Sequence, residues 1–237
     1  MRFFTATLLL ATVLATGSAQ AADDPWNGEV ALGYLRTSGN SDTQSLNGKA
    51  ELKHDAEPLH QRFHVSATNT SDSGEQTGER YAAGYKLDYD FSEKNYLFFS
   101  LDYERDLFGG IDRRGVAAVG YGRRLLESAT HELDVELGAG FRQQRDAAGD
   151  ETDDAIARLS GDYRWQITDN NRFKQTLRVE SGDTNTFTES VSDLKLTIVG
   201  NLYAGIAYTL RNNSDVPAGT EKTDTETLIN FGYTFSY

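Results

Sequence analysis

The stretch that decides the fold is Leu228–Tyr237, which reads LINFGYTFSY. Every second residue in it is hydrophobic, from Ile229 to Tyr237, and small or polar residues stand between them. Strict alternation of this kind is typical of a β-strand with one apolar face and one polar face. The apolar face has to be covered, either by a second layer of protein or by lipid.

The same alternation recurs along the chain and predicts twelve strands. The predicted segments are residues 26–34, 46–52, 59–67, 81–91, 97–103, 117–121, 133–141, 155–165, 173–179, 194–198, 204–210 and 229–237. An even number of strands lets an antiparallel sheet close on itself with both chain ends on one side. We therefore predict an all-β fold, an antiparallel transmembrane β-barrel of about twelve strands.

The connections between the predicted strands differ from one side to the other. Those after even-numbered segments are mostly short, whereas those after odd-numbered segments are long or polar. The predicted long connections are residues 37–42, 68–78, 105–113, 143–154, 181–190 and 211–224. Long loops on one side and tight turns on the other are typical of outer-membrane barrels, whose short turns lie in the periplasm. A soluble β-sandwich, the alternative fold, does not require loop lengths to alternate by side.

Aromatic residues fall near the ends of the predicted strands, as expected of the girdles at both membrane interfaces. With the amino terminus in the periplasm, the predicted periplasmic rim holds Trp26, Tyr89, Phe91, Tyr96, Trp165, Phe173, Phe235 and Tyr237. The predicted outer rim holds Tyr34, Tyr81, Tyr103 and Phe141.

The beginning of the chain has the features of a secretory signal peptide. Arg2 precedes the apolar run FFTATLLLATVLA, and Ala19-Gln20-Ala21 fits a small-residue cleavage site. We expect residues 1–21 to be a signal peptide, and residues 22–237 to form one barrel domain in the cell outer membrane. The chain has no cysteine, which excludes disulfides and a lipid-anchored cysteine.

The last strand resembles the carboxy-terminal assembly signal of bacterial outer-membrane barrels. That signal combines a polar residue, a glycine two positions later, and two final aromatic or apolar residues. The matching residues here are Asn230, Gly232, Phe235 and Tyr237. Most such chains end in phenylalanine, so the final tyrosine is a departure. The resemblance implies that the barrel-assembly machinery is a partner, together with the lipid of the outer membrane.

A second resemblance begins with Trp26-Asn27-Gly28 and continues with Leu32-Gly33-Tyr34. A first-hairpin motif follows, made of Thr37, Ser38, Gly39, Asn40, Ser41 and Asp42, and Thr43 comes next. These residues resemble the salt-induced outer membrane protein family, a bacterial envelope domain of unknown function. The resemblance implies an outer-membrane barrel and supplies no catalytic residue, cofactor or substrate.

The faces opposite the apolar ones carry charges of both signs. The inward-facing basic residues are predicted to be Lys49, Lys53, Arg62, Arg80, Lys86, Arg124, Arg142, Arg158, Arg164, Arg172, Lys174, Arg178 and Lys195. The inward-facing acids are predicted to be Glu29, Glu51, Asp88, Asp90, Asp102, Glu104, Glu132, Asp134, Glu136, Asp162, Glu180 and Asp193. Because the two signs nearly balance, we expect salt bridges and a narrow or occluded lumen. An open selective pore more often has a ring of one sign.

The inward-facing charges nearly cancel, so much of the formal net charge of −13 comes from the predicted connections. Their acidic residues are Asp72, Glu75, Glu79, Asp146, Asp150, Glu151, Asp153, Asp154, Glu221, Asp224 and Glu226. Such loops either bind cations or a surface ligand or simply stay solvated. The run from Asp150 to Asp154 lacks the spacing of a calcium loop, so we expect no metal site. An acidic chain is also a poor candidate for binding nucleic acid.

Candidate catalytic residues are few. The histidines are His54, His60, His64 and His131, and no G-x-S-x-G nucleophile motif is present. His60 and His64 share a face but lie roughly 13 Å apart along a strand, too far to bind one zinc ion. We therefore expect no enzyme activity and no cofactor.

The sequence thus favours a porin-like outer-membrane barrel with a non-enzymatic role in the envelope. That role is structural or that of a narrow passive conduit, with a link to salt or osmotic stress implied by the family resemblance. The alternatives are an outer-membrane enzyme that hydrolyses lipid or peptide, and a surface receptor that uses acidic extracellular loops.

Overall fold

The structure, a computed structural model, describes residues 26–36, 43–216 and 221–236. Twelve strands account for most of these residues. They are β1 (Trp26–Arg36), β2 (Thr43–Ala56), β3 (Leu59–Asp72), β4 (Glu75–Ser92), β5 (Asn95–Asp106), β6 (Ile111–Glu127), β7 (His131–Asp146), β8 (Glu151–Thr168), β9 (Asn171–Ser181), β10 (Thr186–Val199), β11 (Leu202–Asn213) and β12 (Thr223–Ser236). Among the described residues, no helix is long and apolar enough to cross a membrane.

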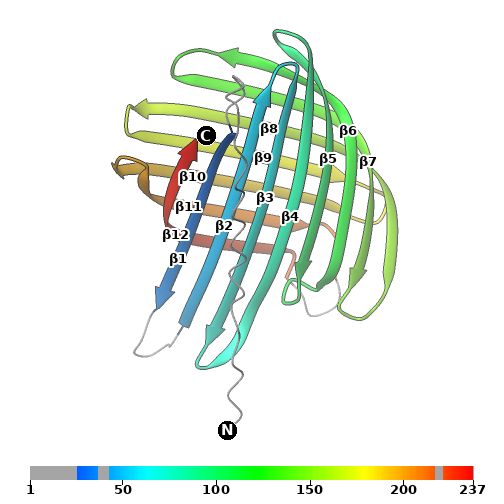
Figure 1. Cartoon of the computed structure of the whole chain (residues 1–237). Helices are drawn as coiled ribbons and strands as arrows, with labels where there is room; N and C mark the ends of the chain where they lie inside the picture. The colour runs from blue at the N-terminus through cyan, green and yellow to red at the C-terminus, as the bar shows by residue number, and fades with distance from the viewer. Residues whose placement is uncertain (1–25, 37–42, 217–220, 237) are drawn as a thin grey trace, which may run out of the picture.

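Each strand pairs antiparallel with its neighbours in the chain, and β1 pairs with β12, so the sheet closes into a barrel (Figure 1). The predicted fold and the predicted strand number are therefore confirmed. Among the described residues the closing ladder is short, running from Asn27 opposite Ser236 to Leu32 opposite Phe231. The ladder between β2 and β3, in contrast, extends from Thr43 opposite Asp72 to Ala56 opposite Leu59.

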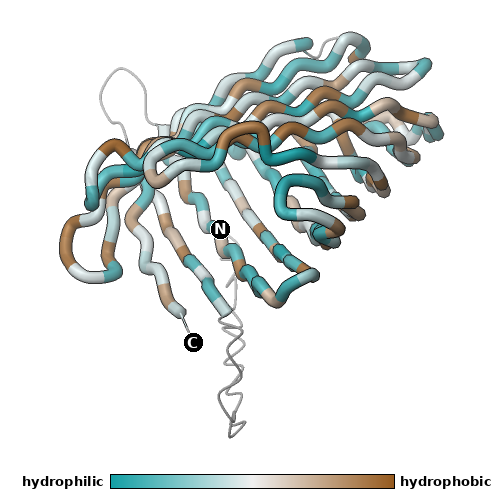
Figure 2. The backbone as a smooth tube through the Cα atoms, turned by 90° about the horizontal axis from the view of Figure 1, so that it is seen from above, coloured by the Kyte–Doolittle hydropathy of each residue, from teal (hydrophilic) through white to brown (hydrophobic). Residues whose placement is uncertain are grey.

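The apolar faces of the strands point outward, as the alternation predicts. On β6, Val119 is 57 % exposed, whereas its neighbour Ala118 is 2 % exposed. Figure 2 shows hydrophobic and hydrophilic residues alternating along the strands. In a closed barrel without a second sheet in the described chain, an apolar outer face fits a lipid surround. The β-sandwich alternative is therefore wrong.

The connections are shorter than predicted on one side of the barrel. Residues 68–78 are not a loop: β3 and β4 continue to a two-residue turn at Ser73 and Gly74. Both turn residues have positive φ, 52° and 83°, as a tight two-residue hairpin requires. Residues 143–154 and 181–190 likewise belong largely to strands. Polar residues continue the ladder because its hydrogen bonds come from the backbone.

Shorter connections also move most of the predicted loop acids onto strands. Asp150 and Glu221 lie in connections, whereas the other acids of that set lie within strands. Asp154 contacts Arg142 and is 4 % exposed, so it is not a freely solvated loop residue.

The predicted aromatic rims agree with the structure, with one correction. Trp26, Tyr89, Phe91 and Trp165 are exposed on the outer face near one end of the barrel. Tyr96 lies at the same end but is 3 % exposed, because it points into the barrel. The alternation places Tyr96 on the inward face of β5, together with the buried Phe98. Tyr237 lies outside the described residues.

Candidate functional site: the barrel lumen

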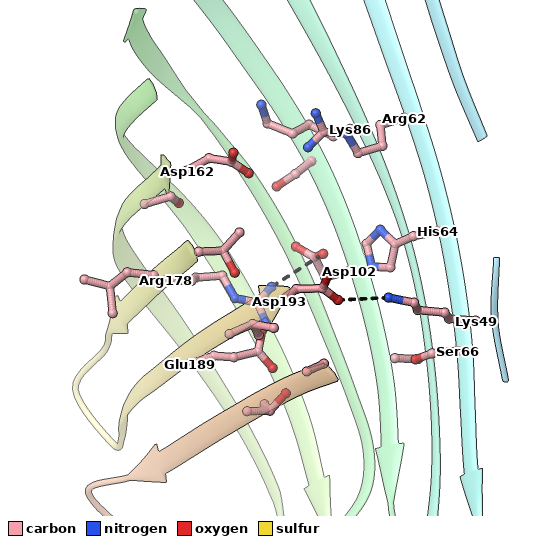
Figure 3. A pocket seen from close by; sticks show the side chains of 18 of the residues that line it. Lys49, Arg62, His64, Ser66, Lys86, Asp102, Asp162, Arg178, Glu189 and Asp193 are labelled. Carbon is pink, nitrogen blue, oxygen red and sulfur yellow. Dashed lines mark hydrogen bonds and ion pairs between the residues drawn. The ribbon is translucent and has the colours of Figure 1, made fainter. Parts of the chain in front are cut away.

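The lumen contains a cavity of about 800 Å³ that is lined mainly by polar and charged side chains. Figure 3 shows residues from opposite sides of the barrel pointing toward one another across this space. Nearly all the charged residues that the alternation placed inside line the cavity or contact residues that line it. Charged side chains that point inward therefore dominate the lining of the lumen.

Glu189 on β10 is one centre of the charge network. Its carboxylate lies 2.8 Å from Arg211 Nε, 3.1 Å from Arg178 Nη2 and 3.8 Å from Arg80 Nη2. Arg80 belongs to β4, which lies diametrically opposite β10 in the order of the closed sheet. Arg80 also donates a hydrogen bond to Glu104, the buried partner of Arg114. The network therefore spans the full width of the lumen.

Asp102 on β5 anchors a second crossing. Arg158 on β8 approaches its carboxylate to 2.8 Å, and Arg178 on β9 approaches it to 3.5 Å. Arg158 also donates to Ser100 at 2.9 Å. The same two arginines lie 3.6 and 3.7 Å from Glu180, which is 1 % exposed. Each of these charges therefore has more than one partner, as buried ions require.

A third crossing joins β2 to β10. Lys49 Nζ lies 3.2 Å from Asp193 Oδ2 and 3.9 Å from Glu29. Lys195, which follows Asp193 on the inward face of β10, contacts Glu29 on β1. Lys49 is more accessible than the arginine networks, with a side chain that is 30 % exposed. These pairs narrow the lumen without burying all of their atoms.

The half of the lumen next to the short turns that follow the even-numbered strands holds further ion pairs. Arg164 lies 2.5 Å from Glu132, 3.0 Å from Asp134 and 3.3 Å from Asp162. Lys174 approaches the other oxygen of Asp162 to 3.0 Å. Most of the inward-facing basic and acidic residues therefore form direct ion pairs, as predicted for a narrow lumen.

Two predicted inward cations differ from the rest. Arg62 and Arg172 line the cavity but form no ion pair within 4.0 Å among the described residues. The Nε atom of Arg62 is buried and has no hydrogen-bond partner. Both residues thus lack a close ion pair, although Arg62 still interacts electrostatically with Glu51 and Asp162.

The wall formed by β5 to β8 is packed and apolar over part of its height. Phe98 and Ala118 are 3 % and 2 % exposed and form a small buried cluster with Tyr96. The ring of Phe98 lies over Gly120 and Gly138, where an added Cβ would come within 2.6 and 2.8 Å of it. Glycine is thus needed at both positions for the ring to lie flat on the sheet.

At the end of the lumen away from Arg164 and Lys174, the turn between β9 and β10 partly covers the opening. Arg142 donates hydrogen bonds to the carbonyl oxygen of Asn185, at 2.7 Å, and to the carboxylate of Asp154, at 2.6 Å. Thr184 also donates to Asp154. Arg142 is 2 % exposed, so this charge holds the turn in place and is not available to solute.

The residues of the predicted assembly signal separate onto two faces of β12. Asn230 is 1 % exposed inside the barrel, and Gly232 lies beneath the ring of Tyr203. Phe235 lies on the outer face, over Gly28 of β1, and so helps to join the two ends of the sheet. Their role in assembly remains a prediction. Tyr237 and the first-hairpin residues 37–42 lie outside the described residues.

The histidines do not form a nucleophile–base pair. His60 lies between two carboxylates, with Nδ1 3.0 Å from Asp55 and Nε2 3.2 Å from Asp90. His54 packs against Trp26 in a tilted arrangement with ring centroids 4.4 Å apart, and His131 forms a hydrogen bond with the Tyr163 hydroxyl. Among the described residues, no group of three or more potential ligands is placed to hold a metal ion.

Sequence reasoning missed three residues of the central network: Arg114, Glu189 and Arg211. All three lie outside the predicted strand segments, because those segments were bounded by their apolar residues. Continuing the inward alternation past the apolar ends of the strands is the signal that would have found them.

Comparisons with known proteins agree with this architecture. The family described as "Protein of unknown function, DUF481" matches residues 30–235. The "Uncharacterized protein YdiY" of Escherichia coli strain K12 is 31 % identical over 214 residues, which cover 90 % of this chain and 84 % of the relative.

Two solved structures are similar in fold. A NanC porin structure has a TM-score of 0.53 at 13 % identity, over 88 % of this chain and 98 % of the porin. The COG4313 outer membrane channel from Pseudomonas putida F1 has a TM-score of 0.50 at 13 % identity, over 90 % and 96 % of the two chains. The barrel is therefore porin-like in fold, and the family match over residues 30–235 shows that the chain belongs to the DUF481 family, whose function is unknown.

Proposed function

We propose that this protein is a narrow passive conduit for small ions and solutes across the outer membrane, and that it is not an enzyme. The observation that carries the proposal is the cavity of about 800 Å³ inside a closed barrel, crossed by ion pairs between strands that are not neighbours. A purely structural barrel needs no such space. The similarity to porin and channel folds supports the same class of function.

The ion pairs that cross the lumen would set how much passes. Lys49 and Asp193 join β2 to β10 and remain partly exposed, with side chains 30 % and 12 % exposed. Salt screens such pairs, since the Debye length falls from about 10 Å at 0.1 M to about 3 Å at 1 M. We therefore expect conductance to rise more steeply with salt than the conductivity of the bulk solution does, which would give a physical basis to the salt link that the sequence resemblance implies.

The test is single-channel conductance of the purified barrel in planar bilayers. Replacing both partners, in K49Q/D193N, removes the crossing without leaving an unpaired charge, so conductance should increase. The control E51Q/K53Q neutralises a pair within one strand, whose atoms are 2.9 Å apart and do not cross the lumen. It should leave conductance nearly unchanged.

Two results would contradict the proposal. Absence of discrete conductance steps at every salt concentration would exclude a conduit. Equal conductance in K49Q/D193N and E51Q/K53Q would show that the crossing between β2 and β10 does not limit passage.

A further inference from the structure

The outer wall of the barrel carries a groove that the lumen does not explain. It lies across β3 to β7 and has a volume of about 570 Å³. Its outward-facing lining residues include Phe63, Ala83, Tyr103, Gly115, Ala117 and Phe141. A Cβ added at Gly115 would meet no atom within 4 Å, so the small residues leave open space between the aromatic ones. A hollow of this volume, lined by apolar side chains, suits part of a hydrocarbon chain.

An arginine cluster lies at the outer end of this groove. Arg105 is the next outward residue after Tyr103 on β5, and Arg113 is the outward residue before Gly115 on β6. Arg145 on β7 is the direct cross-strand partner of Arg113. Like charges that face each other across a sheet are destabilising, so this position favours an anion from outside the sheet.

The acids near the arginine cluster compensate it only in part. Glu151 lies 2.7 Å from Arg113, and Asp112 lies 3.7 Å from Arg105. All four side chains are 36 to 55 % exposed, and ion pairs as exposed as these are weak because water and salt screen them. Arg145 has no ion pair within 4.0 Å among the described residues. The cluster therefore keeps donors that an external anion can use.

We propose that the groove and the arginine cluster bind one phosphorylated lipid of the outer leaflet. An acyl chain lies in the groove, and the lipid phosphate accepts hydrogen bonds from Arg113 and Arg145, with Arg105 beside them. Guanidinium groups suit phosphate because they donate in a planar, two-pronged geometry. This inference rests on the outer-membrane location in the proposed function, but not on conduction.

The order of residues along the wall favours a lipid over a protein partner. Apolar residues fill the middle of the wall, Tyr103 and Phe141 follow at the predicted outer rim, and the arginines come next. That order matches acyl chain, interface and phosphate in a membrane lipid. The three arginines occupy adjacent strands, so one headgroup can reach all of them.

The experiment is native mass spectrometry of the full purified barrel, released from detergent in the presence of EDTA so that no divalent cation bridges the contact. The probes are bisphosphorylated lipid A and the same lipid after removal of its phosphates. Wild-type protein should retain the phosphorylated form preferentially. The variant R113Q/R145Q should bind it at least about tenfold more weakly, which corresponds to about 1.4 kcal/mol.

The matched control is K94Q/R123Q, which removes the same number of positive charges at the other end of the barrel. Arg123 lies on the outward face of β6, as Arg113 does. This control should bind lipid A as wild type does. A second variant, A83L/A117L, fills the groove and should weaken binding of both lipid forms.

The proposal is overturned if R113Q/R145Q binds lipid A as tightly as wild type, or if both lipid forms bind wild type equally well. It is also overturned if A83L/A117L has no effect on binding. Conductance should be unchanged in R113Q/R145Q, because both side chains face away from the lumen. A wild-type barrel that retains lipid A but does not conduct would contradict the proposed function alone.

Discussion

Two walls face the same lumen but are built from different residues. On β5 and β6, Phe98 and Ala118 are almost fully buried inside the barrel. On β3, His64 and Ser66 also face inward, yet both are exposed to the cavity (Figure 3). One wall therefore acts as a hydrophobic core, whereas the other lines the space through which a solute would move.

The difference comes from how side chains are paired across strands. Phe98 lies over glycines on the two following strands, so its ring packs against backbone and excludes water. His64 lies over Gly84 in the same way, but Ser66 and Ala82 beside it are too small to fill the remaining width. Small neighbours therefore leave the cavity on the β3 side.

The largest expected effect comes from truncating the packed wall. Phe98→Ala should lower the free energy of unfolding by about 3–5 kcal/mol, because it removes buried area and leaves a cavity. Urea titration of the refolded barrel in lipid measures it. Phe99→Ala is the control: its side chain faces outward, where acyl chains fill the space, so the loss should be smaller. Equal losses would contradict a core inside this wall.

A smaller effect should follow from adding one methyl group to the same wall. Gly120→Ala places a Cβ 2.4 Å from the carbonyl oxygen of Leu137 and 2.6 Å from Phe98, and neither backbone nor ring can easily move. Overpacking of this kind costs about 1–3 kcal/mol, again measured by urea titration. Gly161→Ala, where a Cβ meets no atom within 4 Å, should be tolerated. The idea fails if both variants are equally stable.

The smallest expected effect distinguishes the walls by chemical access. The natural chain has no cysteine, so single cysteines can be labelled without background. Ser66→Cys should react with a small charged methanethiosulfonate at least about tenfold faster than Ser100→Cys, because access governs thiol modification. Ser100 is 2 % exposed and contacts Arg158. Similar rates, followed by mass spectrometry, would show that the two walls are equally open.

The sequence predicted the strands and their faces well, because alternation depends only on neighbouring residues. Val119 and Leu32 lie outward and Ala118 and Ala31 inward, as the period of two requires. The same rule put Lys49 and Asp193 inside the barrel. It could not show that they meet, since that contact depends on closure of the sheet between β1 and β12.

The errors arose where polarity was taken to mark the end of a strand. Residues around Ser73 continue the ladder because their backbone groups pair irrespective of the side chains, so a predicted loop became a tight turn. Glu189 was missed for the same reason. Tyr96 was predicted at the rim because it lies near the end of β5. Its position on the strand places it on the inward face, where its hydroxyl donates a hydrogen bond to Glu136 at 2.9 Å.

The seam between β1 and β12 has a mechanical consequence. A closed sheet opens most easily along its shortest ladder, and within the described part of the chain that is the ladder between β1 and β12, with six residue pairs. Phe235 packs over Gly28 and so joins β12 to β1 on the outside. On the inside, Tyr203 of β11 lies over Gly232 of β12, and its hydroxyl donates to Glu29 of β1 at 3.5 Å. Resistance to opening is therefore concentrated in a few aromatic–glycine contacts at one end of the wall.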